Sequence, residues 1–382
     1  MLLIFKMEFF FFGCWNRDNC SGTRLDYRKA VITEIARKNY EFGIIAGDNA
    51  YARYAKQYYL DTIDNGFDML YDINAFKLGV IGNHDIYVGD LKSSAIHEGS
   101  PKNAAIHSGA PAQSILEREV KHGSVLFPAA NYVVNYKNAR VIVVDTNVLN
   151  GGSVPRALYE KLDFTNLFFN PESLIQWMEE ELDRPFDGWT FVVGHQPIIS
   201  AKIKKTKHKK ESLVEVPRLM KLLGGRPKTV YLSADIHQFQ AWELEYHGYK
   251  VPMFVAGTGG AEPDPIKPGL TLDIEGVIQE PLIVQDAFGY CSVKIKEKEI
   301  IVTYHALGCD IGNEVGSNKK VQIRVALDGK MTLVPSSSKM TRSKRCPAVP
   351  IEERMCEVNP VKESSSLYSE GSSRAQTGRT KR

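Results

Sequence analysis

Long hydrophobic runs are missing from this sequence. No apolar stretch approaches the roughly 18 to 20 residues that a membrane-spanning helix needs, so we expect no transmembrane segment and no membrane partner. Cysteine is scarce as well, because the 382 residues contain only six, with no CxxC pair. This usage disfavours a disulfide scaffold and is typical of free thiols in a reducing compartment. The six are Cys14, Cys20, Cys291, Cys309, Cys346 and Cys356.

A large excess of charge is also missing, since 48 basic and 45 acidic residues leave a net charge of +3. With 43% apolar and 24% charged residues, the composition is globular and excludes a wholly disordered or coiled-coil chain. The basic excess lies in residues 336–382, which carry ten basic, five acidic and ten serine residues without periodicity. We predict that this basic, serine-rich tail is disordered. The remaining body has a net charge of −2, which gives no strong case for a nucleic-acid partner.

The N-terminal sequence MLLIFKMEFFFFGCWN has two interpretations. A signal peptide is one, but Lys6 and Glu8 interrupt the apolar run and no small-residue cleavage site follows. The other, which we favour, is a buried strand over Met7–Phe12. We therefore expect an intracellular, cytoplasmic protein and keep secretion as the alternative.

Short apolar strands alternate with amphipathic helices along the body of the chain. The clearest helix is predicted over Pro171–Leu182, where Asn170 can cap the first turn and the apolar side chains share one face. Such alternation indicates an α/β protein with a parallel or mixed sheet covered by helices. The predicted strands are Met7–Phe12, Phe42–Ala46, Lys77–Ile81, Val141–Val144, Thr190–Val193 and Val230–Leu232.

Several of these strands end in a side chain that can bind a metal. One such Asp or His is usually structural, but a series of them in chain order is not easily explained by loop capping. The carboxyl ends of parallel strands meet at one edge of a sheet, so these side chains should converge. Carboxylate, amide and imidazole donors together suit Fe, Mn or Zn, and two such ions form a known centre for phosphoester hydrolysis. The residues are Asp48, Asn83, His195, Asp235 and His237.

Four blocks carry a resemblance to a known family. They are GDNAY at Gly47–Tyr51, GNHD at Gly82–Asp85, GHQP at Gly194–Pro197 and a variant of GHxH at Ala234–His237. In order and spacing they resemble the calcineurin-like metallophosphoesterases. The tyrosine of the first block is similar to that of the purple acid phosphatases, a group that includes the tartrate-resistant enzymes.

The resemblance implies a fold of two mixed β-sheets packed as a sandwich and flanked by helices. We predict that residues 7–306 form this catalytic domain and that a β-rich extension covers residues 307–335, before the tail. The implied activity is hydrolysis of phosphoesters, with monoesters favoured, by a metal-bound hydroxide at a dinuclear site. The implied cofactors are iron together with zinc, manganese or a second iron. The substrate would be a phosphorylated small molecule or a phosphoprotein, and the oligomeric state is left open.

The resemblance also implies a role for each residue of the blocks. Asp48 would bridge both metals, and Tyr51 and His237 would bind the first metal. Asn83 and His195 would bind the second.

Two further residues are implied to act on the substrate. His84 would face the phosphate, where it would stabilise developing charge or protonate the leaving oxygen. Asp85 would orient His84.

Two positions depart from the family's pattern. Cys14 stands where the family has an aspartate ligand of the first metal. Cys14 could bind as a thiolate, Asn16 or Asp18 could substitute for it, or the first site could be weakened. Asp235 replaces the first histidine of the last block, where a carboxylate can still bind the second metal, as in the similar GDVH block of PhoD-like alkaline phosphatases.

Two other functions remain open at this point. The first is a catalytically impaired binding protein that has kept the fold, an alternative that rests on Cys14. The second is a phosphodiesterase or nuclease of the same superfamily. A lysine-rich segment, Ala201–Lys210, is predicted to be a solvated loop, although it could also gather anionic substrates.

Overall fold

The computed structural model describes residues 7–16, 27–49, 51, 66–86, 125–149, 165–204, 207–213, 216–265, 271–307 and 319–335. For residues 201–204 and 207–212 and for residue 319, it describes the backbone alone. All of these residues belong to one unit, Met1–Cys346. Within these ranges, no helix is both long and apolar enough to cross a membrane.

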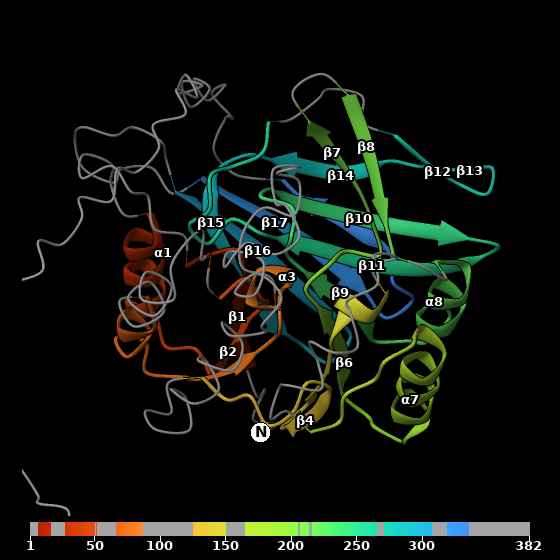
Figure 1. Cartoon of the computed structure of the whole chain (residues 1–382), viewed down its shortest axis with the longest axis horizontal. Helices are drawn as coiled ribbons and strands as arrows, with labels where there is room; N and C mark the ends of the chain where they lie inside the picture. Colours follow the sequence, from red (N-terminus) through yellow and green to blue (C-terminus); the bar gives the residue numbers. More distant parts are fainter. Residues whose placement is uncertain are drawn as a thin grey trace, which may run out of the picture. The chain divides into compact units, whose positions relative to one another are not determined.

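Two seven-stranded sheets organise the described part of the chain (Figure 1). The first has the strand order β18-β17-β16-β15-β1-β2-β3, and the second has the order β14-β10-β11-β9-β6-β5-β4. The strands of the first sheet are β1 (Met7–Phe12), β2 (Phe42–Ile45), β3 (Phe76–Gly79), β15 (Phe288–Ile295), β16 (Glu299–Leu307), β17 (Lys319–Ala326) and β18 (Met331–Val334). Those of the second are β4 (Tyr132–Tyr136), β5 (Ala139–Val144), β6 (Trp189–Gly194), β9 (Thr229–Ser233), β10 (Phe239–Tyr246), β11 (Tyr249–Ala256) and β14 (Pro281–Gln285).

Both sheets are mixed, as predicted. In the first, β1, β2 and β3 run parallel, whereas β15 to β18 pair antiparallel. In the second, β5, β6, β9 and β11 run parallel between antiparallel edges. The parallel strands therefore point their carboxyl ends toward one edge of each sheet, which is where such folds bind ligands.

The two sheets pack face to face. The strand β1 is a continuous apolar run because both of its faces are buried. Phe9 and Phe11 point into the core between the sheets, whereas Phe10 and Phe12 join a second cluster beneath helix α1 (Tyr27–Ala36). A strand buried on both faces cannot alternate between apolar and polar residues. The ring of Phe9 meets that of Phe191, from the opposite sheet, edge to face at 4.9 Å.

Helices cover the outer faces of the sandwich (Figure 1). α7 (Pro171–Asp183) and α8 (Val216–Leu223) pack on the outer face of the second sheet in one apolar cluster. α7 begins as predicted, because the Asn170 side chain accepts a hydrogen bond of 2.9 Å from the backbone N–H of Ser173. The α/β sandwich flanked by helices is therefore confirmed.

The lysine-rich segment is not the loop that we predicted. It forms an antiparallel hairpin of β7 (Ile199–Lys204) and β8 (Lys207–Ser212), which pair with each other as a separate small sheet. A second small sheet joins β12 (Leu272–Ile274) to β13 (Val277–Gln279). β17 and β18 continue the first sheet from within residues 307–335, and the predicted tail lies outside the described residues.

A buried polar cluster joins the segment after α1 to the first sheet. The Lys38 ammonium donates to the Tyr290 hydroxyl at 2.7 Å and lies 3.3 Å from Nδ1 of His305. Since an ammonium can only donate, Nδ1 accepts, and Nε2–H donates to the Ser292 hydroxyl at 2.9 Å. Burial, with the charges of Lys38 and Lys320, lowers the pKa of His305 to about 3.

This buried histidine predicts a loss of stability in acid. His305 is neutral in the folded protein but becomes charged in the unfolded chain below pH about 6.5, so the unfolded state binds more protons. Stability should therefore fall as the pH drops from about 6.5 toward 3. His305→Gln should reduce this slope by up to about 1.4 kcal/mol per pH unit, as measured by urea unfolding between pH 7 and pH 4.5. Equal slopes in the two proteins would contradict the assignment.

Candidate metal centre

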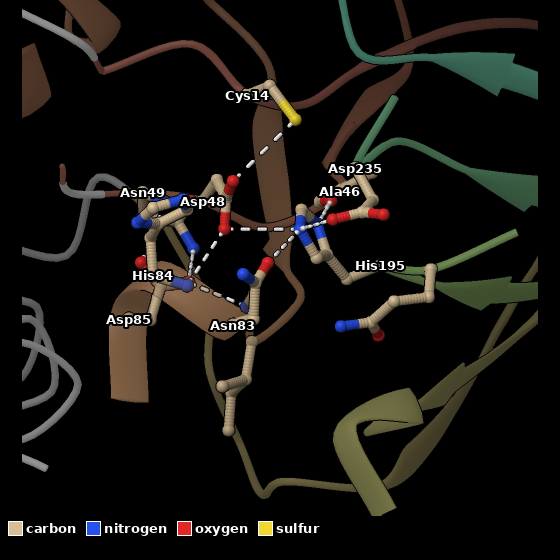
Figure 2. Close-up of polar contacts among 12 residues, drawn as sticks. Cys14, Ala46, Asp48, Asn49, Asn83, His84, Asp85, His195 and Asp235 are labelled. Carbon is tan, nitrogen blue, oxygen red and sulfur yellow. Dashed lines mark hydrogen bonds and ion pairs between the residues drawn. The ribbon is translucent and has the colours of Figure 1, made fainter. Parts of the chain in front are cut away.

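The candidate ligands lie where the parallel strands of both sheets end. Cys14 follows β1, Asp48 follows β2, His195 follows β6 and Asp235 follows β9. Asn83 begins the short helix α3 (Asn83–Ile86) after β3. Figure 2 shows these side chains, carried by strands of both sheets, pointing toward one another.

The backbone is strained at three of these positions. Cys14, Asp48 and Asp235 have φ angles of 51°, 54° and 58°, in the left-handed region that side chains other than glycine rarely adopt. Gly47, at φ 85°, precedes Asp48, and a Cβ atom there would lie 2.4 Å from the His195 ring. Strain of this kind persists only where the surroundings hold it, and it is concentrated at functional sites.

Three side-chain oxygen atoms that could bind a metal surround the Nε2 atom of His195 (Figure 2). It lies 3.0 Å from Oδ1 of Asn83, 3.1 Å from Oδ1 of Asp48 and 3.6 Å from Oδ1 of Asp235. His195 and Asp48 are almost fully buried, while Asp235 is partly open to solvent. The side chains predicted for the second metal therefore meet at one point.

Both candidate histidines have their Nδ1 atom bound to a backbone carbonyl. Nδ1 of His195 lies 2.7 Å from the Ala46 oxygen, and Nδ1 of His237 lies 2.9 Å from the Glu262 oxygen. Because a carbonyl only accepts, Nδ1 carries a proton in both rings and Nε2 faces the site. This is how proteins commonly orient metal-binding histidines.

The residues predicted for the first metal form two close pairs. Sγ of Cys14 lies 3.8 Å from Oδ2 of Asp48, and the Tyr51 hydroxyl lies 3.2 Å from Nε2 of His237. The side chain of Asn16 is held elsewhere, because it donates to the Asn49 carbonyl and accepts from Arg28. Asp18, the other suggested substitute, lies outside the described residues.

The site brings two carboxylates, those of Asp48 and Asp235, close to His195. Burial raises the pKa of Asp48, but the charges of His195 and His84 outweigh it and hold that pKa well below its usual range. Burial lowers the pKa of His195, but Asp48 and Asp235 raise it by more, to about 9. The site therefore favours a positive charge at Nε2 of His195.

This donor set fits a transition metal. An ion with bonds of about 2.1 Å separates its ligands by roughly 3.0 to 3.4 Å in octahedral or tetrahedral geometry, close to the distances around His195. Mixed carboxylate, amide and imidazole donors suit Zn, Mn or Fe. Cys14, Asp48 and His195 also offer atoms that all lie within 4.8 Å of one another.

A sequence comparison identifies the family to which this site belongs. The family model described as calcineurin-like phosphoesterase matches residues 7–239, more than half of the chain. The chain is a calcineurin-like phosphoesterase. Members of this family are metal-dependent phosphoester hydrolases that generally use two divalent ions, and the chain is a hydrolase of this class. No functionally curated protein matches it by sequence.

Solved structures show the same fold at low sequence identity. PhoD is 11% identical, with a TM-score of 0.58, over 87% of this chain and 72% of PhoD. The purple acid phosphatase PPD1 from yellow lupin (Lupinus luteus) seeds is 14% identical, with a TM-score of 0.51, over 79% of this chain and 51% of that chain. At these identities the likeness concerns the fold alone.

The two residues predicted to act on the substrate lie on α3 of the phosphoesterase site. The His84 ring is half-buried, 4.5 Å from the ring of Tyr51, and its backbone N–H donates to Asp48. Asp85 is buried and accepts hydrogen bonds from the backbone of Asn49 and of Gly82. Burial and the charge of Asp48 raise the pKa of Asp85 to about 7. Its role as the partner of His84 stays a prediction.

Asn49 is a site residue that the sequence patterns did not single out. Its side-chain amide donates to Asp85 and to the Val80 carbonyl and accepts from the Trp15 indole. Its backbone carbonyl accepts from Asn16. Asn49 thus ties together the loops that follow β1, β2 and β3, and its place beside Asp48 was the only signal in the sequence.

A second polar network holds the loop of His195. The Gln196 backbone N–H donates to the Thr146 hydroxyl at 3.0 Å, and the Gln196 amide donates to Asn147 at 2.9 Å. The Asn147 amide in turn donates to Asp145 at 2.8 Å. The partners of Gln196 lie at the end of β5 and in the short 3-10 helix Thr146–Leu149. A loop without any predicted metal ligand thus helps to position His195.

Asn49→Ala should destabilise the phosphoesterase fold and its metal centre together. The substitution leaves buried donors and acceptors of three loops without partners, so we expect a loss of about 2 to 4 kcal/mol in unfolding free energy. Weaker metal retention on dialysis should accompany it. The exposed residue Asn135 on β4 offers the control, since Asn135→Ala should change stability by no more than about 0.5 kcal/mol. Equal effects of both variants would show that Asn49 does not organise the site.

Proposed function

We propose that this phosphoesterase hydrolyses phosphate monoesters at a site that holds two metal ions. The observation that carries the proposal is the convergence of Asp48, Asn83 and Asp235 on Nε2 of His195, at 3.0 to 3.6 Å. When bound, the two ions would activate a water molecule as the nucleophile and neutralise the phosphoryl oxygens. The preference for monoesters is supported by the GDNAY block with its tyrosine.

In this proposal the two ion positions share Asp48. Asn83, His195 and Asp235 hold the second ion, while Tyr51 and His237 hold the first. The metals would be iron with zinc, manganese or a second iron. The substrate would be a phosphorylated small molecule or a phosphoprotein, and the protein would act inside the cell.

His84 supplies a proton in this scheme. Its side chain is half-buried and therefore partly open to solvent, and its backbone N–H donates to Asp48 at 3.1 Å. That hydrogen bond fixes the start of α3 against the proposed bridging carboxylate. The imidazole would then donate to the leaving-group oxygen as the bond to phosphorus breaks.

Removing His195 should sharply reduce both metal binding and activity. We expect His195→Ala to bind fewer ions per chain and to lower kcat/KM for an aryl phosphate by about 100-fold or more, because several kcal/mol of transition-state stabilisation are lost. Metal analysis after reconstitution with Fe, Zn or Mn should give two ions per wild-type chain. Fewer than one ion per chain would overturn the proposal.

The same assay separates the alternatives. An inactive wild-type protein combined with an active Cys14→Asp variant would favour an impaired binding protein. Faster hydrolysis of a bis-aryl diester than of the matched monoester would favour a phosphodiesterase.

His84→Asn tests the proton donor. Loss of a general acid matters most when the leaving group is a poor one, so kcat for an alkyl phosphate should fall by roughly 10²- to 10⁴-fold. The decrease for p-nitrophenyl phosphate, whose leaving group needs no proton, should be much smaller. Equal losses for both substrates would assign His84 to charge stabilisation instead.

A further inference from the structure

Cys14 differs from the other described cysteine in what it faces. Cys291 on β15 is buried in the apolar core between the sheets, where burial raises the pKa of its thiol. Cys14 is equally buried, yet its Sγ atom lies 3.8 Å from Oδ2 of Asp48 and close to a donor atom of His195. Cys14 also borders a small apolar cluster, but its sulfur faces a buried carboxylate, which space filling alone does not require.

The backbone fixes Cys14 in this place. Its N–H donates to the Gly47 carbonyl at 3.0 Å, and its own carbonyl accepts from the N–H of Ala261 at 2.8 Å. With φ at 51°, the residue adopts a conformation that costs energy outside glycine. Neighbouring loops thus hold a strained residue so that its sulfur faces the buried carboxylate of Asp48.

The neighbouring polar residue does not compete for this position. The Asn16 amide donates to the Asn49 carbonyl at 2.8 Å, and its oxygen accepts from Arg28 at 2.7 Å. Tyr51 and Cys14 belong to one buried cluster with Ala46, Ala234 and Ala261, and the Tyr51 hydroxyl interacts with the Cys14 thiol. The position of the first metal therefore has one sulfur ligand atom, that of Cys14, besides its oxygen and nitrogen ligand atoms.

We propose that Cys14 is a thiolate ligand of the first metal ion and makes that position selective for zinc or iron over manganese. The inference rests on the proposed two-ion site and concerns its chemistry. A thiolate keeps the negative charge of the carboxylate that it replaces, but it is a softer donor, and soft donors discriminate against manganese. The thiol proton is released to solvent when the ion binds.

Spectroscopy of the cobalt-loaded protein tests the ligand directly. Co²⁺ bound to a thiolate gives an intense near-ultraviolet charge-transfer band, which an ion bound by oxygen and nitrogen alone does not give. We expect this band in the wild-type protein and in Cys291→Ser, and its loss in Cys14→Ser and in Cys14→Asp. X-ray absorption of the zinc-loaded wild type should show a sulfur neighbour at about 2.3 Å, a result that needs no variant to fold.

Metal competition tests the selectivity. When wild-type protein is dialysed against equal zinc and manganese, the bound ratio should favour zinc, and Cys14→Asp should lower that ratio by roughly tenfold or more. Two bound ions with no sulfur neighbour and no cobalt band would overturn the role of Cys14 and leave the hydrolase proposal standing. In that case Cys14 would be only a neutral thiol that donates to Asp48. Fewer than one ion per chain would instead overturn the two-ion function itself, and the thiolate with it.

Discussion

The carboxylate of Asp48 is buried to the point where water scarcely reaches it. An isolated charge at that depth costs several kcal/mol, so the surrounding residues must compensate for it. His195 lies at 3.1 Å, and the backbone N–H of His84 donates to the same oxygen. The left-handed turn at Gly47 and Asp48 places the carboxylate beside these partners. The strained backbone of Asp48 is a consequence of that placement.

The partners of Asp48 come from parts of the chain that are far apart in sequence. They meet only because β1, β2 and β3 in one sheet and β6 and β9 in the other all end at the same side of the sandwich. A one-residue slip in any of these strands would turn its terminal side chain to the opposite face. The apolar core between the sheets therefore sets the geometry of the polar centre as much as the ligands themselves do.

Sequence patterns predicted the parts of this molecule that depend on local chemistry. The four-phenylalanine strand, the Asn170 cap of α7 and the ligand blocks at strand ends were all visible from residue type and spacing. The roles of Asn49, Thr146 and Gln196 could not be predicted, because they depend on contacts between loops that only the folded chain brings together. The hairpin at β7 and β8 was missed because lysines dominate it, and lysine carries little strand propensity.

The position of β1 in its sheet also affects how the chain folds. β1 lies between β2, its neighbour in sequence, and β15, whose Cys291 pairs with Phe11 across roughly 280 intervening residues. During synthesis, one edge of this strand of four consecutive phenylalanines therefore stays unpaired until about three quarters of the chain has been made. Long-range pairing of this kind is slow, and exposed apolar edges aggregate. The edge of β1 that the finished sheet covers is therefore exposed while the chain grows, at the stage when apolar surface is most prone to aggregation.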